Sequence, residues 1–236
     1  LPHIARRYRT YGFSSQADWV ASEVAGEGAG MRFTVHERGR ALGRVFLPIP
    51  GRHNVLNALA ALAVASELEV DFATAAAALA DFGGVERRFE HKGEAAGVTV
   101  VDDYAHHPAE IRATLAAARG VHAGRLVAVF QPHRYTRTRD CLDEFARAFN
   151  DSDRLIVTEV YAAGETPIPG VDGAALTAQI RAHGHRDARF VATLEDVADT
   201  LAKELEPGDW VLTLGAGDVS RLGPMLLDRL RAGGAG

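Results

Sequence analysis

Predicted strands and helices alternate regularly along the sequence from about residue 90 onward. Apolar runs rich in β-branched residues predict strands at 98–101, 126–130, 155–160, 190–191 and 210–214. Amphipathic stretches predict helices at about 108–119, 139–149, 173–183, 195–205 and 218–231. Near-continuous apolar strands joined by helices are typical of a mostly parallel, doubly wound α/β sheet, because helices cover both faces of a parallel sheet. In such a sheet, ligands bind at the edge where the strands end.

The first 90 residues show a different pattern, with strands followed by two helices. Alternation at 31–36, a turn at 37–40 and an apolar return at 44–47 predict a hairpin, with short strands at 8–13 and 18–21. A helix is expected from Asn54, its predicted N-cap, and a second, alanine-rich helix at 72–80 after Asp71. We therefore expect two domains, at 1–89 and 90–236.

Composition narrows the classes of partner. The net charge of −5 at pH 7 argues against a nucleic acid or an anionic membrane. No apolar run approaches the ~20 residues that a membrane span needs, and no signal peptide opens the chain. Cys141 is the single cysteine, so there is no disulfide framework. We expect a cytoplasmic protein, and the sequence does not indicate an oligomeric state.

Polar groups concentrate directly after the strand at 98–101. Five side chains that hydrogen-bond or titrate follow within six residues: Asp102, Asp103, Tyr104, His106 and His107. Capping of the helix that begins near Pro108 requires only one such residue, so we interpret the group as a site, with capping as the alternative.

The strand at 126–130 also ends in chemically active residues. His133, Arg134 and Arg137 follow Gln131, and the two arginines are three residues apart at a helix start. Two guanidiniums on one side of a helix suit bidentate capture of a carboxylate or a phosphate. The alternative is a solvated basic surface.

Three further segments are weaker candidates. Tyr161 and Glu165, after the third strand, either line the same crevice or serve loop packing and capping. The Gly-Ala-Gly turn at 215–217 permits anion binding, but simple turn geometry is favoured because the third glycine of a dinucleotide fingerprint is absent. Arg87 and Arg88, at the expected domain boundary, either reach a phosphate or form a basic linker.

His53, Asn54 and Asn57 lie at the start of the first predicted helix. Asn57 is one turn beyond His53, and an amide offers both the donor and the acceptor that an adenine edge requires. The alternative is capping by Asn54, with Asn57 incidental. A metal centre built from the Asp and His residues at 102–107 and His133 is disfavoured, because no His-x-x-x-His pair occurs on a helix.

Four motifs occur along the chain in one order. The segments 51–61, 84–89, 102–108 and 131–138 read Gly-Arg-His-Asn-Val-Leu-Asn-Ala-Leu-Ala-Ala, Gly-Val-Glu-Arg-Arg-Phe, Asp-Asp-Tyr-Ala-His-His-Pro and Gln-Pro-His-Arg-Tyr-Thr-Arg-Thr. Together they closely resemble the Mur ligase family of peptidoglycan synthesis, in particular the members that add L-alanine to UDP-N-acetylmuramate. The segments 160–165 and 214–218 fit the same family.

The resemblance implies the end of the family's central ATPase domain over 1–89 and a complete Rossmann-like C-terminal domain over 90–236. The family's phosphate-binding loop, Gly-x-x-Gly-Lys-Thr-Thr, does not occur in this sequence, nor do its UDP-binding domain and its Mg²⁺ ligands. We therefore expect a fragment that is inactive alone and holds no metal itself.

The implied chemistry is ATP-driven amide formation through an acyl phosphate. By resemblance, Arg134 and Arg137 hold the alanine carboxylate, and His106 with Tyr104 lies near the incoming amine. His106, Arg134 and Arg137 are the expected catalytic residues. The expected ATP contacts are Asn57 with His53 and Asn54 for adenine, Asp103 for the ribose and Arg88 for the phosphates.

Two alternatives stay open at this point. Ligases that recycle murein peptides share an Asp-x-x-His-His-Pro loop, although the segment at 131–138 favours the alanine-adding members. The chain could instead be a nucleotide- or ligand-binding module without turnover. A metal-dependent hydrolase, the least favoured class, would require bound zinc or iron.

Overall fold

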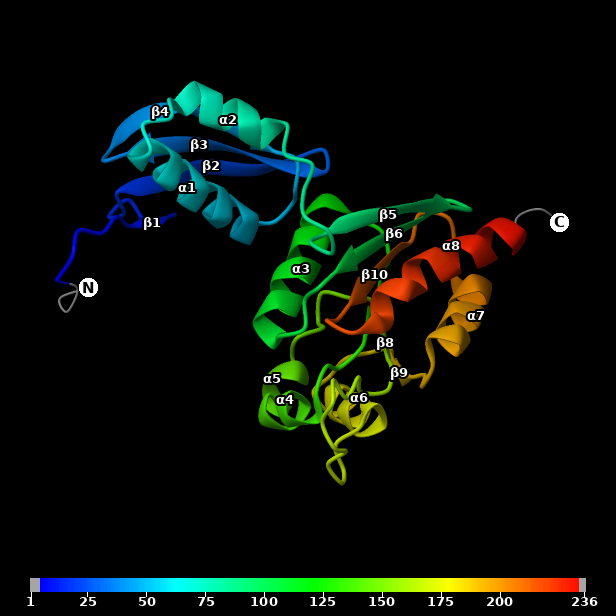
Figure 1. Ribbon diagram of the computed structural model, residues 1–236. Coiled ribbons are helices and arrows are strands. Elements are labelled where there is room, and N and C mark those ends of the chain that lie inside the picture. Colours follow the sequence, from blue (N-terminus) through cyan, green and yellow to red (C-terminus); the bar gives the residue numbers. More distant parts are fainter. Residues whose placement is uncertain (1–4, 234–236) are drawn as a thin grey trace. The chain divides into compact units, whose positions relative to one another are not determined.

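The computed structural model describes residues 5–233. They form two compact units, unit 1 up to Gly84 and unit 2 from Val85. Figure 1 shows the helices and strands of both. The division falls between Gly84 and Val85, and the first strand of the second unit begins at Glu90. No helix of the described part of the chain has the length and apolar content needed to cross a bilayer.

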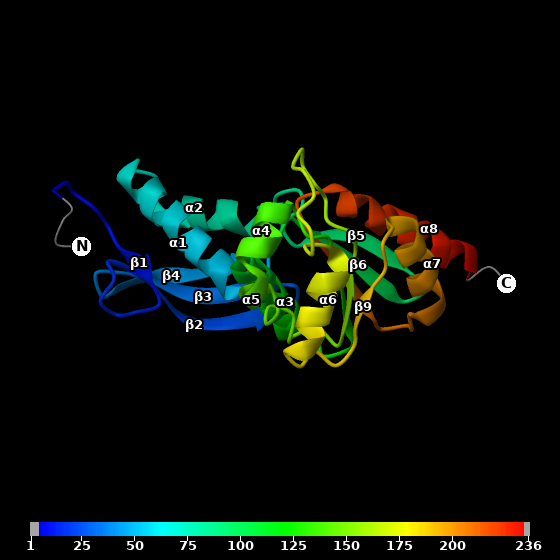
Figure 2. The same cartoon turned by 90° about the horizontal axis from the view of Figure 1, so that it is seen from below.

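Unit 1 is a four-stranded sheet covered by two helices. Its strands are β1 (Tyr11–Gly12), β2 (Trp19–Glu27), β3 (Gly30–Glu37) and β4 (Arg40–Leu47), which lie in that order. β2, β3 and β4 are antiparallel, which confirms the predicted hairpin. The helices α1 (Arg52–Glu67) and α2 (Phe72–Ala80) lie over one face of this sheet, where α1 buries Val55 and Leu59 against Trp19 and Phe33 (Figure 2).

The two helices of unit 1 begin in different ways. α2 follows Asp71 as predicted, and the carboxylate of Asp71 caps it by accepting the amide of Thr74 at 3.0 Å. The prediction of Asn54 as the cap of α1 is wrong. Gly51 occupies the N-cap with φ 106°, and Asn54 lies inside the first turn, where its amide donates to Pro50 O at 2.8 Å. Glycine adopts such a positive φ without steric cost.

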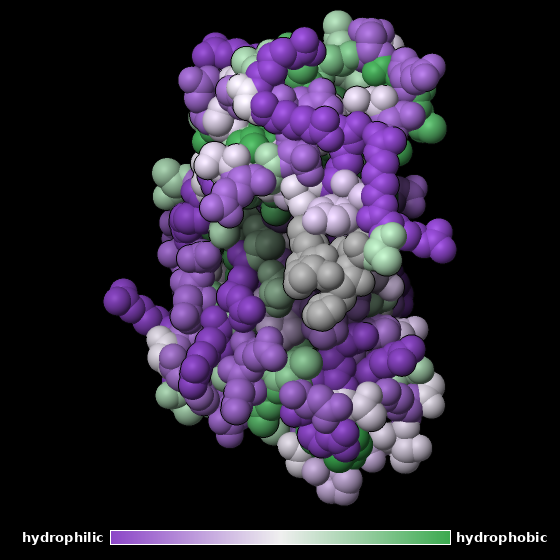
Figure 3. Space-filling model, turned by 90° about the vertical axis from the view of Figure 1, so that its left-hand side faces the viewer, coloured by the Kyte–Doolittle hydropathy of each residue, from purple (hydrophilic) through white to green (hydrophobic). Residues whose placement is uncertain are grey.

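The outer face of α1 is also apolar. Val64 and Leu68 are 59% and 71% exposed, and they line a hollow of about 410 Å³ together with Tyr8 and Tyr11. Figure 3 shows a side of the molecule on which hydrophilic residues predominate and apolar residues are scattered among them. The described residues thus bury only one of the two apolar faces of α1.

Unit 2 is built on a six-stranded sheet in the order β5-β6-β10-β7-β8-β9. The strands are β5 (Glu90–Ala95), β6 (Val98–Asp103), β7 (Leu126–Phe130), β8 (Arg154–Val157), β9 (Ala188–Phe190) and β10 (Trp210–Leu214). All pairs are parallel except β5 with β6. The predicted mostly parallel sheet is confirmed. The edge strand β5 was not predicted, because its charged sequence, interrupted at Gly93 by a register shift, lacks an apolar run.

Helices cover both faces of this sheet, which confirms the doubly wound arrangement (Figure 1). The helices of this unit are α3 (Pro108–Val121), α4 (Tyr135–Asp140), α5 (Leu142–Phe145), α6 (Gly173–Ala182), α7 (Leu194–Glu204), the 3₁₀ turn η1 (Asp218–Arg221) and α8 (Leu222–Gly233). One face buries Ile111, Phe145 and Leu176 of α3, α5 and α6, and the other buries Leu201 and Leu226 of α7 and α8.

The prediction of one helix over 139–149 is wrong. The segment forms α4 and α5, which meet at Cys141 with φ −106° and ψ 19°. The break allows Phe145 and Phe149 to pack on Phe130, with ring centroids 5.4 and 5.1 Å away. Packing against the sheet thus overrides the local helical pattern.

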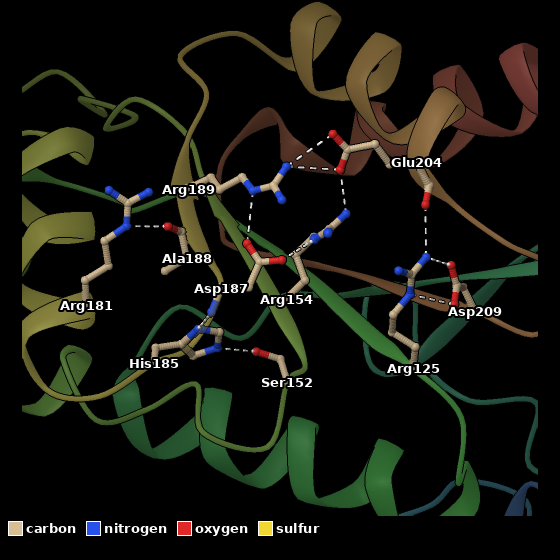
Figure 4. Close-up of polar contacts among 10 residues, drawn as sticks. All are labelled: Arg125, Ser152, Arg154, Arg181, His185, Asp187, Ala188, Arg189, Glu204 and Asp209. Atoms are coloured by element: carbon tan, nitrogen blue, oxygen red, sulfur yellow. Dashed lines mark hydrogen bonds and ion pairs between the residues drawn. The ribbon is translucent and has the colours of Figure 1, made fainter.

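Ion pairs connect the residues at the amino ends of the parallel strands (Figure 4). Arg154, at the start of β8, pairs with Asp187 at 2.7 Å and with Glu204 at the end of α7. Arg189 of β9 contacts the same two carboxylates, and Arg125 pairs with Asp209 just before β10. This network stabilises the edge opposite the loops that carry the polar motifs.

Candidate functional site

The polar loops of unit 2 follow the carboxyl ends of four neighbouring strands. β6, β10, β7 and β8 are adjacent in the sheet, so the loops that begin after Asp103, Leu214, Phe130 and Val157 share one edge. This is the edge at which open α/β sheets bind ligands. The structure therefore brings the two main predicted motifs of this unit together.

Asp103 holds the first of these loops in place. Its two carboxylate oxygens accept the amides of Ala105 and Phe89, both at 2.8 Å. Burial raises the pKa of Asp103, against the opposing effect of those amides and of the charge of Arg88. A ribose contact by Asp103 stays a prediction, because the described hydrogen bonds of its carboxylate are made within the unit.

His106 is oriented as a proton acceptor. Its Nδ1 lies 2.9 Å from the carbonyl oxygen of Tyr104, so we assign the ring proton to Nδ1 and the lone pair to Nε2. Burial is the main cause that lowers the pKa of His106, and the charge of Arg137 adds to it. The imidazole is consequently neutral near pH 7.

Glu110, in the first turn of α3, fixes this histidine loop. Its carboxylate accepts the backbone amides of His106 and His107, each at 3.1 Å. The role of Glu110 was not predicted, although an acidic residue three positions after a helix N-cap is the sequence signal of a capping box. Glu110 restricts the freedom of the loop that carries His106.

The second loop brings cations to the same edge. The ring of His133 lies 6.0 Å from that of His106. Arg134 is the N-cap of α4, and Arg137, one turn further, has a guanidinium nitrogen 3.3 Å from Nδ1 of His133. Burial and then the charge of Arg137 lower the pKa of His133. Two neutral imidazoles and two guanidiniums form a group that attracts an anion and can take up a proton.

Arg87 and Arg88 have different environments. The guanidinium of Arg87 donates to Asp102 at 2.9 Å and to the carbonyls of Gly215 and Gly217 at 2.6 and 3.3 Å. Arg88 is exposed, and its guanidinium carbon lies 5.7 Å from the ring of Tyr104. Nothing in the sequence distinguishes the two residues, and the structure makes Arg88 the one available to a ligand.

The Gly-Ala-Gly turn serves packing. A side chain at Gly217 would lie 2.3 Å from the amide oxygen of Gln131, and one at Gly215 would lie 2.8 Å from the backbone oxygen of the same residue. The carbonyls of both glycines bind Arg87.

Of the two possibilities for Glu165, the structure shows capping, since its carboxylate accepts the amide and hydroxyl of Thr136. The hydrogen bond from the Thr136 hydroxyl is the main cause that lowers the pKa of Glu165.

The three candidate adenine residues lie in unit 1, in the first turns of α1. The amide of Asn57 donates to Asn54 at 3.3 Å, and Asn57 is exposed. His53 is half-buried. Their contact with a nucleotide stays a prediction.

The described residues contain no group of three or more His, Cys, Asp or Glu side chains placed to hold a metal ion. The imidazoles of His106 and His133 are instead accompanied by arginines. The geometry favours an anion site over a metal centre.

Comparison with known proteins defines the class. Residues 87–217 match the glutamate ligase domain of Mur ligases, and residues 2–65 match the Mur ligase middle domain. The chain belongs to the Mur ligase family. Within it, the chain is 52% identical over 235 residues to a UDP-N-acetylmuramate–L-alanine ligase of Syntrophobacter fumaroxidans, covering 99% of this chain and 50% of that protein.

Solved structures show the same relationship. The crystal structure of a UDP-N-acetylmuramate–alanine ligase from Thermotoga maritima covers 95% of this chain, with a TM-score of 0.81 and 30% identity, over 48% of its own length. A murein peptide ligase from Psychrobacter arcticus matches with a TM-score of 0.64 and 26% identity, covering 95% of this chain and 46% of its own. The chain thus spans about half the length of the relatives that it matches.

Proposed function

We propose that this chain is the C-terminal half of a cytoplasmic, ATP-dependent ligase that joins L-alanine to UDP-N-acetylmuramate in peptidoglycan synthesis. The grouping of His106, Arg134 and Arg137 around His133 at one edge of the sheet carries the proposal. Two guanidiniums can bind a carboxylate, and a neutral imidazole can accept a proton from an amine. The carboxylate and the amine are the two polar groups of an amino acid. The relatives named UDP-N-acetylmuramate–L-alanine ligase support the choice of alanine.

In the proposed reaction, ATP phosphorylates the muramate carboxylate and releases ADP. The amine of alanine attacks the acyl phosphate, and the tetrahedral intermediate expels inorganic phosphate. Arg134 and Arg137 bind the carboxylate of alanine and so orient its amine. Nε2 of His106 accepts a proton from the ammonium group of alanine, which leaves the free amine that attacks. The ring of Tyr104, edge-on to His106 at 5.2 Å, restricts the position of the imidazole.

The proposed nucleotide contacts are those that the family resemblance implies. Arg88 binds the ATP phosphates and Asp103 the ribose, while Asn57, with His53 and Asn54, binds adenine. By the same resemblance, we assign the Mg²⁺ ligands to a part of the ligase outside this chain.

Reconstitution tests the proposed function. The chain alone is expected to release no phosphate from ATP. The chain fused to the N-terminal half of the Syntrophobacter fumaroxidans relative is expected to release phosphate when UDP-N-acetylmuramate and L-alanine are both present. Turnover with a murein peptide in place of alanine would identify a peptide-recycling ligase instead. Nucleotide binding without any turnover would identify a binding module.

Substitution of Arg134 tests the carboxylate contact. In the reconstituted ligase, Arg134→Ala is expected to raise the KM for alanine by about tenfold or more, as loss of a hydrogen bond between charged groups does. The KM for ATP should change much less. Arg139→Ala is the matched control, because Arg139 is exposed on the same helix and pairs with Asp140. An unchanged KM for alanine in Arg134→Ala would remove this assignment.

A further inference from the structure

The loop after β8 continues the pairing of β8 with β7 beyond the ends of the strands. The amide of Tyr161 donates to Pro132 O at 2.8 Å, and the amide of Arg134 donates to Tyr161 O at 2.9 Å. His133 and Tyr161 form a parallel bridge, and their rings stack with centroids 5.5 Å apart. The residues before α4 are thus fixed from a neighbouring loop.

Arg134 requires this support because its backbone is strained. Its φ of 73° with ψ 134° lies in a region that strongly favours glycine. Such a conformation persists only where surrounding contacts determine it. Here Tyr161 O accepts the amide of Arg134, while Arg134 O accepts the amide and the hydroxyl of Thr138 at 3.1 and 2.8 Å.

Glu165 supplies the cap that α4 lacks. Arg134, at the N-cap, makes no side-chain capping bond. Glu165 instead accepts the amide of Thr136 at 3.0 Å and its hydroxyl at 2.6 Å. A turn with positive φ at Ala163 and Gly164, closed by the bond from Glu165 N to Ala162 O, directs this carboxylate toward the helix.

A short helix depends strongly on such a cap. α4 has six residues, and isolated helices of that length are not stable in water. Arg137 lies in the turn that the cap closes, so loss of the cap displaces its guanidinium as well as the backbone of Arg134.

We infer that Glu165 is a positioning residue for the site that binds the amino-acid carboxylate. The inference rests on the proposed function, in which Arg134 and Arg137 hold that carboxylate. Glu165 acts on the substrate only through α4. Its charge alone would have the opposite effect, since a carboxylate near Arg134 weakens the attraction of a second carboxylate.

Two substitutions separate position from charge in the reconstituted ligase. Glu165→Ala removes the cap and is expected to raise the KM for alanine about fivefold, with kcat and the KM for ATP changed less than twofold. Glu165→Gln keeps an oxygen acceptor for Thr136 and removes the charge, so its KM for alanine is expected to stay near that of the parent. If charge dominates, both variants lower the KM, and that result overturns the inference.

Asp172→Ala is the matched control. Asp172 caps α6 in the same unit by accepting the amide of Ala175 at 2.7 Å, and α6 does not carry Arg134 or Arg137. Its loss is expected to lower the Tm about as much as Glu165→Ala does, with no change in the KM for alanine. Equal rises in KM for the two variants would show a general effect of destabilisation and overturn the inference.

Amide hydrogen exchange tests the cap in this chain without any activity. Glu165→Ala is expected to remove protection of the Thr136 amide, whereas Asp172→Ala leaves it intact. Unchanged protection in Glu165→Ala would overturn the inference. An Arg134→Ala ligase with unaltered KM for alanine removes the assignment of Arg134 to the alanine carboxylate and overturns this inference with it. A KM that responds to Arg134→Ala but not to Glu165→Ala overturns the inference alone.

Discussion

At the scale of single residues, neighbouring side chains of the same type have separate roles. Arg87 binds a carboxylate and two backbone carbonyls, and Asp102, its partner, is fully buried. The other oxygen of Asp102 accepts the hydroxyl of Thr213. Arg87 therefore fixes the first residues of unit 2 to the ends of β6 and β10. Arg88, the next residue, is left exposed beside Tyr104.

Arg87→Met is expected to lower the free energy of unfolding by about 2–3 kcal/mol, because it leaves the buried Asp102 without its ion pair. Arg88→Met is the control and should change that free energy by less than about 0.5 kcal/mol, as exposed substitutions do. Urea denaturation of both variants measures the difference. Equal stability of the two variants would show that the contacts of Arg87 contribute nothing.

At the scale of elements, the two edges of the parallel sheet are stabilised differently. The carboxyl edge, which carries the proposed site residues His106, Arg134 and Arg137, is fixed by caps and by backbone bonds between loops. The amino edge is fixed by ion pairs and by His185, which is 8% exposed and lies between Ser152 and the amide of Asp187 (Figure 4). Nδ1 of His185 accepts the hydrogen bond from that amide. A proton on Nδ1 would therefore place two N–H donors against each other.

The stability of the fold is expected to fall as the pH is lowered, over a pH range set by the pKa of His185. Burial lowers the pKa of His185 below its ordinary 6.5, although Asp187 and Asp153 act the other way. Because the folded state binds the proton less well than the unfolded state, this contribution is complete above pH 6.5 and is lost as the pH falls through the lower, folded pKa.

The Tm of the chain and of His185→Asn, measured between pH 7.5 and 5, tests this dependence. The variant should be less stable at pH 7.5 and should lose less stability on acidification. His183→Asn, an exposed change two residues away, controls for the general effect of removing a histidine. Parallel pH curves for the chain and His185→Asn would rule out the role of His185.

At the scale of the whole molecule, each unit has its own core. Trp19, Phe33 and Leu59 belong to the cluster of unit 1, and the two clusters of unit 2 lie on opposite faces of its sheet. The connecting residues are poorly buried, with Phe82 and Val85 at 40% and 56% exposure. Exposed connections between compact cores are typical sites of proteolysis.

Limited digestion with thermolysin, which cleaves before apolar residues, is expected to cut first at 82–85 and to leave unit 2 as a stable fragment. Intact-mass measurement over time identifies the site. The exposed Gly164 turn serves as an internal comparison, because its neighbours are held by the bonds of Tyr161 and Glu165. First cleavage at that turn would contradict the expected order of stability.

The sequence by itself determined the parallel sheet and the positions of its main motifs. The strands at 126–130 and 210–214 have the predicted bounds, because an apolar β-branched run between polar loops is a local signal. The meeting of the loops at 102–107 and 131–137 follows from the rule that parallel strands end at a common edge.

Only the tertiary structure decided how individual side chains are used. The split at Cys141 follows from the packing of Phe145 on Phe130, and the role of Arg87 follows from carbonyls at Gly215 and Gly217. The capping of α4 by Glu165 likewise joins two loops. Each of these interactions links residues far apart in the chain, so no local pattern of propensity or spacing could specify it.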